Sequence, residues 1–208
     1  MPPRSIAVFV EVTPKMAVAS ALEWPGWCRA GRDEGAALTA LADYAGRYAP
    51  VAAHAGASFP SPVAFDVAER VPGGPATAFA APECRRPFPQ VTAEAERAMV
   101  IPAAARRLAG LVTAVWAIFD QIAAASSAEL RKGPRGGGRD RDQLIGHVIG
   151  ADTAYARKLG IKRSPGSAAG GVDHLPGGLA SRVNRPRAVG RRVRRAARGR
   201  LCMHYILG

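Results

Sequence analysis

The feature that most constrains this chain of 208 residues is a change of sequence pattern near Gly160. Before it, apolar residues recur at the spacings of helices and strands, and turn-forming residues separate these segments. After it, residues 161–208 lose the periodicity, and Arg, Gly, Ala and Pro supply 27 of these 48 residues. Because periodic apolar faces are what a chain buries in a core, we expect the folded part to end near residue 160 and the tail to be largely disordered.

The net charge of +13 is concentrated in the same tail. Residues 161–208 hold eleven basic residues and one acidic residue, Asp173, so the tail carries +10 and residues 1–160 carry +3. This distribution indicates an ordinary globular surface followed by a basic segment. The side chains that suit contact with nucleic acid or an anionic membrane are Arg191, Arg192, Arg194, Arg195, Arg198 and Arg200.

Composition narrows the class of protein further. Hydrophobic residues make up 48% of the chain, enough for a core, but aromatic residues make up only 6%, so Ala and Val must do much of the packing. Three cysteines without CxxC spacing fit a reducing cytoplasm and argue against a disulfide framework or a zinc knuckle. No uninterrupted apolar run approaches the roughly 18 residues that span a bilayer. We therefore expect a cytoplasmic protein without a membrane span.

Residues 1–71 predict a small α+β domain with the element order β-β-α-β. Alternating apolar residues and a high β-branched content indicate a strand over residues 5–13. A short turn leads to an alanine-rich second strand over Met16–Leu22. The next stretch, residues 24–31, contains a Pro-Gly pair, so we expect turns there.

The helix of this domain has a marked beginning. Asp33 is suited to cap the helix and Glu34 to stabilise its first turn. Pro50 ends or interrupts the helical pattern, and residues 63–71 alternate as a third strand. The apolar residues at helical spacing are Leu38, Leu41, Ala45 and Tyr48.

Residues 72–101 are rich in Pro, Gly and Ala and predict a linker, whereas residues 102–160 predict a helical hairpin. The first helix begins at Pro102. A glycine-rich basic loop follows at residues 132–140. Two amphipathic helices are half of a bundle and need a partner, which a homodimer would supply. The apolar stripes are Leu108, Leu111, Val112, Val115, Phe119 and Ile122 in the first helix, and Leu144, His147, Val148, Ala151 and Tyr155 in the second.

Residues 129–160, with Glu-Leu-Arg-Lys-Gly-Pro-Arg-Gly-Gly-Gly-Arg-Asp-Arg-Asp followed by Gly-His-Val-Ile-Gly-Ala-Asp, resemble the second helix of DinB-like proteins of the actinobacterial type. The resemblance covers residues 102–160 and implies a four-helix bundle. It also implies a divalent metal, of the zinc or nickel type, bound by one histidine of the second helix and a His-x-x-x-His pair of the fourth. His147 matches the first ligand, but no His-x-x-x-His follows it. The implied function is an ancestral metal-dependent transferase or hydrolase, inactive here because those ligands are missing.

Residues 5–71, with Val-Glu-Val-Thr-Pro-Lys and Glu-Trp-Pro-Gly-Trp-Cys before the helix capped by Asp33, resemble an HicB-like strand–strand–helix–strand module. This resemblance implies pairing with a protein partner. Trp24 and Trp27 flank the Pro-Gly turn, where they form a recognition surface or, in the interpretation we prefer, pack against the hairpin.

The residues of the helical hairpin allow two interpretations each. A lone histidine on an apolar helix face, as at His147, is usually a core residue with a hydrogen bond, but the same position suits a ligand. Arg135 and Arg139 in the glycine-rich loop suit an anion, although the loop also serves simply to link two helices. Asp140 and Asp142 suit acid–base chemistry, and helix capping explains them with fewer assumptions.

The tail also has two explanations. It suits salt-dependent contact with nucleic acid, but no aromatic residue is interleaved with its arginines before Tyr205. Arg, Gly, Ala and Pro can all be encoded by codons built only of G and C, so we hypothesise a frameshift near codon 160 that replaced the third and fourth helices. A His-x-x-x-His in another reading frame of the gene would support this. The alternative function is a non-enzymatic binding module, acting through the basic tail or the HicB-like domain.

Overall fold

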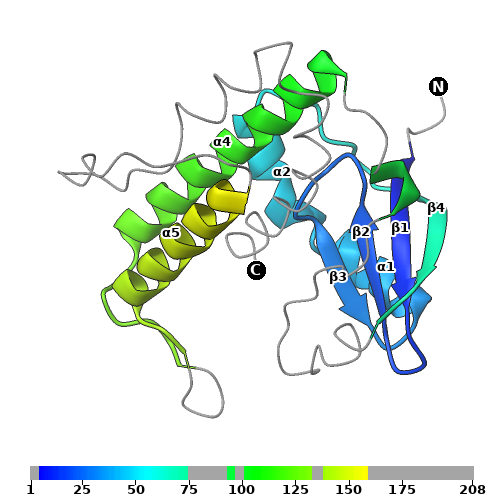
Figure 1. The fold of residues 1–208 in the computed structure, drawn as a ribbon, viewed down its shortest axis with the longest axis horizontal. Coiled ribbons are helices and arrows are strands. Elements are labelled where there is room, and N and C mark those ends of the chain that lie inside the picture. The colour runs from blue at the N-terminus through cyan, green and yellow to red at the C-terminus, as the bar shows by residue number, and fades with distance from the viewer. Residues whose placement is uncertain (1–4, 75–92, 97–100, 133–137, 159–208) are drawn as a thin grey trace.

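The fold is that of a computed structural model, which describes residues 5–74, 93–96, 101–132 and 138–158 (Figure 1). A four-stranded sheet with covering helices is followed by two long helices, so the predicted α+β class is confirmed. The predicted basic tail, residues 161–208, and most of the predicted linker lie outside the described residues.

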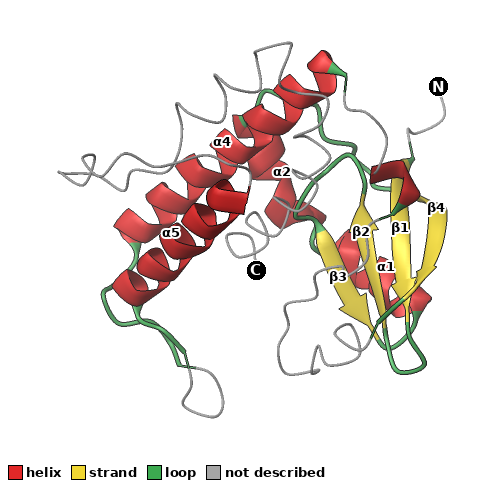
Figure 2. Cartoon of the chain, viewed as in Figure 1, coloured by secondary structure: helices red, strands yellow, loops and turns green. Residues whose placement is uncertain are grey.

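The sheet has the strand order β3-β2-β1-β4 (Figure 2). β1 (Ile6–Val12), β2 (Ala17–Ala21) and β3 (Cys28–Gly31) pair antiparallel in succession, whereas β4 (Phe65–Pro72) pairs parallel to β1. A parallel neighbour requires a crossover connection, and two helices supply it. β4 is thereby placed at one edge of the sheet and β3 at the other.

β3 corrects the expectation that residues 24–31 form only turns. The strand is short and reads Cys-Arg-Ala-Gly, without a β-branched or aromatic residue, so its own composition does not indicate a strand. Residues 28–31 form a strand because they pair with β2. Its last residue must be small, because a Cβ added to Gly31 would lie 2.2 Å from the backbone nitrogen of Ala37. β3 therefore enters the following helix by a close backbone approach that only glycine allows.

The crossover consists of α1 (Glu34–Asp43) and α2 (Ala45–His54). The predicted cap is confirmed, since the amide of Ala36 donates to Asp33 Oδ1 over 2.8 Å. The prediction that Pro50 ends or interrupts the helical pattern is wrong, because α2 continues through it and the break between the helices lies at Tyr44. A proline removes one helical hydrogen bond. The buried Val51 and Ala52 just after it hold α2 against the core.

Aromatic side chains fill the space between the sheet and these helices. Trp24 and Trp27 are 4% and 1% exposed, so they pack in the core, as the preferred interpretation expected, and present no recognition surface. Trp27 Nε1 donates to the carbonyl of Leu41 over 3.0 Å, and the Tyr48 hydroxyl donates to the carbonyl of Pro25 over 2.9 Å. Buried Trp and Tyr require such partners. The turn before β3 is thus fixed to both crossover helices.

α4 (Pro102–Ala125) belongs to the same core. Its Leu111 and Val115 are fully buried in the cluster that contains the sheet and α2, and the guanidinium of Arg107 lies 4.3 Å from the ring centroid of Trp24. Ile122, predicted in the apolar stripe, is instead 60% exposed, because the last turns of α4 extend beyond the core.

α4 is also long and apolar enough to cross a bilayer, on length and composition alone, and no other helix of the described residues is. The helix contains no uninterrupted apolar run of that length, because Arg106 and Arg107 precede its central apolar stretch and Asp120 and Gln121 follow it. The buried Leu111 and Val115 give a core helix the same composition, so this feature is weak evidence of a membrane.

Candidate functional site

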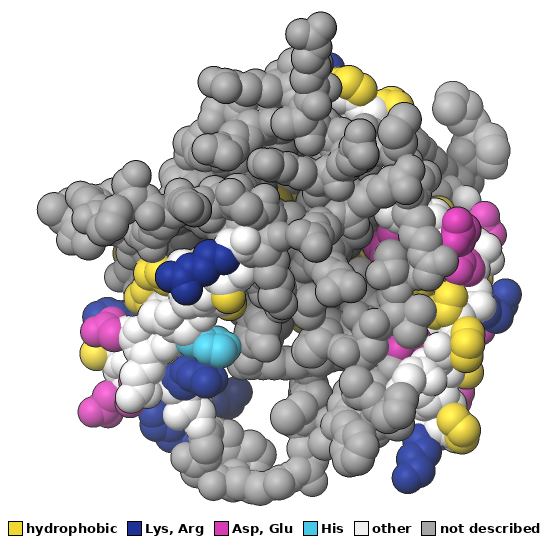
Figure 3. All heavy atoms as spheres, viewed as in Figure 1, with side chains coloured by type: hydrophobic (Ala, Val, Ile, Leu, Met, Phe, Trp, Pro, Cys, Tyr) yellow, Lys and Arg dark blue, Asp and Glu magenta, His cyan; other side chains and the backbone are white. Residues whose placement is uncertain are grey.

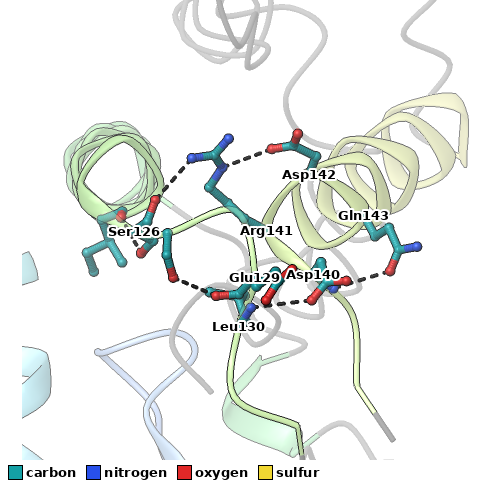
Figure 4. Close-up of polar contacts among 9 residues, drawn as sticks. Ser126, Glu129, Leu130, Asp140, Arg141, Asp142 and Gln143 are labelled. Carbon is teal, nitrogen blue, oxygen red and sulfur yellow. Dashed lines mark hydrogen bonds and ion pairs between the residues drawn. The ribbon is translucent and has the colours of Figure 1, made fainter.

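The connection between α4 and α5 (Arg141–Lys158) is held by side-chain contacts to backbone groups (Figure 4). Arg141 reaches back to α4, where its Nη1 donates to the carbonyl of Ser126 over 3.0 Å. The carboxylate of Asp140 accepts from the amide of Leu130 over 3.3 Å and from the amino group of Lys132. The contact with Lys132 lowers the pKa of Asp140.

These contacts decide between the two interpretations of the acidic pair. α5 begins directly after Asp140, whose amide donates a hydrogen bond to Gln143 Oε1 over 3.2 Å. Asp142 accepts from Arg141 Nε over 2.9 Å. Both carboxylates therefore have structural partners in the connection, which favours bracing over acid–base chemistry. Among the described contacts neither carboxylate accepts from an amide in the first turn of α5, so the predicted helix capping is not observed.

The glycine-rich loop lies only partly within the described residues. Arg139 is exposed beside Gly138, whose φ of 142° favours glycine, and Arg135 lies outside the described residues. Basic side chains gather at this end of the helical hairpin in the space-filling view (Figure 3). Anion binding by Arg135 and Arg139 stays a prediction.

His147 is half-buried on α5. The predicted inner stripe is partly wrong, because the fully buried positions are Val148 and, one turn later, Asp152, whose side chain is 6% exposed. The apolar periodicity predicted an exposed position for Asp152, because its side chain is polar. The side chain of Tyr155 lies outside the description.

The residues that the structure describes contain no group of three or more His, Cys, Asp or Glu side chains that could hold a metal ion. His147 is thus not joined there by the two further ligands that a divalent site needs. The remaining downstream histidines, His174 and His204, lie outside the described residues, as do the six arginines predicted to contact nucleic acid. The described side chains do not fit the metal centre that the DinB-like resemblance implies.

A buried polar group on the sheet was not predicted. Glu11, Ser20 and Cys28 lie on adjacent strands and are 0%, 5% and 2% exposed. Burial raises the pKa of the Cys28 thiol to about 12. This thiol is therefore neutral at physiological pH and is not suited to nucleophilic chemistry.

The outer edge of β4 is a different kind of candidate site. Within the described residues no strand pairs with it. The amide of Ile6 donates to the carbonyl of Ala64 over 2.7 Å, and the carbonyl of Ala7 accepts from Leu22 of the loop after β2 over 3.0 Å. Because backbone groups alternate in direction along a strand, Asp66 points its amide toward β1 and Val67 points its amide away from the sheet.

Side chains hold β4 in place from both faces of the sheet. Arg70 makes two hydrogen bonds of 2.8 Å to the carboxylate of Glu34 in the first turn of α1. Glu69 Oε2 accepts from the amide of Glu94 over 2.8 Å, at the start of the 3-10 helix η1 (Glu94–Glu96). A register shift beside Val8 and Phe9 leaves one extra residue in β4, a bulge of the kind that is frequent beside functional sites.

No family model matches the chain, and neither a curated protein nor a solved structure matches it. The DinB-like and HicB-like resemblances therefore stay predictions. The sequence could not reveal the β4 edge, because which strand is outermost depends on the strand order.

Proposed function

We propose that this chain is a protein-binding module, and that the outer edge of β4 receives an extended segment of the partner as an added strand. The observation that supports this most is that β4, with eight residues, is the longest strand of the sheet and is unpaired on its outer side within the described residues. Such an edge offers a row of backbone donors and acceptors to another chain.

The contacts of β4 favour binding over accidental exposure. The ion pair of Arg70 with Glu34 and the hydrogen bond from Glu94 to Glu69 fix the strand before a partner arrives. A fixed edge loses less conformational entropy on binding than a mobile one. The HicB-like resemblance of residues 5–71 also implies a protein partner.

The test is the substitution Val67→Pro. Its missing amide and its ring lie on the outer side of β4, so the pairing with β1 is kept and an added strand is blocked. Asp66→Asn is the matched control, because it changes a side chain of the same strand and keeps every amide. Each variant is tagged, and the proteins that it captures from cell extract are compared by quantitative mass spectrometry.

We expect at least one protein to be retained by the wild type and by Asp66→Asn and lost by Val67→Pro, while circular dichroism shows the same fold in all three. Loss of the partly buried Val67 side chain should lower the melting temperature modestly. In the purified complex, the amides of Val67 and Arg70 should then gain protection from hydrogen exchange. Capture that does not differ between the three proteins would contradict the proposed function.

A further inference from the structure

Two arginines share one tyrosine ring beside β3. The guanidinium carbon of Arg29, from β3, lies 3.1 Å from the ring centroid of Tyr44, and that of Arg47, from the first turn of α2, lies 5.3 Å from it. Arg47 Nη1 donates to the Tyr44 hydroxyl over 3.3 Å, and Arg29 Nη1 donates to the carbonyl of Cys28 over 2.7 Å. Each guanidinium keeps several further N–H donors.

Other arginines of the sheet and its covering helices pair with carboxylates. Arg70 pairs with Glu34, and Arg32 pairs with Asp33 over 3.1 Å. In the part of the chain that the structure describes, no carboxylate lies at ion-pair distance from Arg29 or Arg47. Burial lowers the pKa of Arg29, and the charge of Arg47 lowers it further. The pair is therefore a concentration of positive charge that an anion would stabilise.

The beginning of α2 adds to this positive charge. The beginning of α1 has carboxylates of its own, since Asp33 caps the helix and Glu34 lies in its first turn. α2 has neither, because Tyr44 makes no side-chain capping bond and the first turn contains no acidic residue. The first turn of a helix carries a partial positive charge, and α2 presents it next to Arg47. A Cβ added at Gly46 would meet no atom within 4 Å, so this turn is open.

We propose that Arg29, Arg47 and the first turn of α2 form a binding site for a phosphate group. A phosphate dianion neutralises two guanidiniums at once, accepts their paired N–H donors, and is the anion for which a helix N-terminus is best suited. The site adjoins β3, at the opposite edge of the sheet from β4. It therefore does not depend on the proposed protein-binding edge.

The test is a titration of the full chain with inorganic phosphate at constant ionic strength, followed by the Nε–Hε resonances of the arginines in NMR spectra. Arg47→Gln removes one proposed contact. Arg32→Gln is the matched control, because it removes the same charge from a side chain that is 89% exposed and directly follows β3. Equal changes in net charge leave any binding by the basic tail the same in both variants.

We expect the resonances of Arg29 and Arg47 to shift together with one midpoint. Arg47→Gln should weaken phosphate binding about tenfold or more, and Arg32→Gln should leave it unchanged. If circular dichroism shows that Arg47→Gln does not fold, Arg29→Lys replaces it, with the same expected loss. Equal affinities of the Arg47→Gln and Arg32→Gln variants would overturn the site. Binding of acetate as tight as that of phosphate would overturn the assignment to phosphate.

Discussion

The α/β layer, which consists of β1–β4 with α1 and α2, differs from the helical hairpin of α4 and α5 in how it uses buried side chains. In the layer, Trp27, Tyr48 and Leu41 are almost completely buried. Trp27 donates a hydrogen bond to the carbonyl of Leu41, and Tyr48 donates one to the carbonyl of Pro25. In the hairpin, α4 contributes Leu111 and Val115 to that same core, whereas α5 is hydrogen-bonded to the end of α4 through Arg141 in its first turn. The domain boundary expected between residues 71 and 102 therefore does not separate two cores. α4 is part of the layer, and α5 is an addition to it.

The largest effect should come from Leu111→Ala. Truncating a fully buried leucine costs about 2 to 5 kcal/mol of unfolding free energy. If α4 belongs to the core of the layer, tryptophan fluorescence and helical circular dichroism should show one shared urea transition, shifted to lower urea. Ile122→Ala, at a position 60% exposed on the same helix, should change stability little. Loss of helix before any change in fluorescence would show that α4 is a separate unit.

A smaller effect is expected from Arg141→Gln at the α4–α5 connection. The substitution removes the bonds to Ser126 and Asp142, which together contribute about 1 kcal/mol. Hydrogen exchange should become faster in α5 and stay unchanged in β1, since the layer does not use this contact. Arg157→Gln, an exposed position late in α5, is the control. Faster exchange throughout β1 would mean that α5 is as much part of the core as α4.

The loss of stability at low pH should come from carboxylates of the α/β layer and of the α4–α5 connection whose pKa values are lowered in the folded state. The amide of Ala36 lowers the pKa of Asp33 below its usual value. Because the folded-state pKa is the lower one, the contribution of Asp33 is complete above its unfolded pKa and is lost as pH falls through the folded value. The melting temperature of the wild type should thus fall on acidification below about pH 4, and that of Asp33→Ser should fall less. An identical acid response in both proteins would exclude this cap as a source of the pH dependence.

The smallest effect should follow from His147→Ala. The side chain is half-buried in α5, outside the core that α4 shares. The proposed binding function predicts that metal content after purification is the same with and without this histidine. Stoichiometric zinc or nickel that disappears on substitution would instead support the DinB-like metal centre, completed by residues outside the description or by a second copy of the chain.

Sequence patterns predicted the elements whose own residues determine them. β1 was visible from its alternation, and α1 from the cap at Asp33. β3 was not, because pairing with β2 and not its composition makes it a strand. The buried Glu11 and Asp152 were missed because hydrophobic periodicity places every carboxylate outside. The two candidate sites could not be predicted for a related reason, since a sheet edge and a pair of arginines on one tyrosine ring form only when segments distant in the sequence come together.

The most direct test of the central claim, that β4 has an open edge, is amide hydrogen exchange in the free full-length chain. Val67 and Asp66 are neighbours in the same strand, and by alternation only the amide of Asp66 points toward β1. The open edge predicts fast exchange at Val67 and exchange at Asp66 that is slowed to the level of the sheet core. Equal protection of the two amides would mean that another part of the chain already occupies this edge, and it would contradict the proposed function.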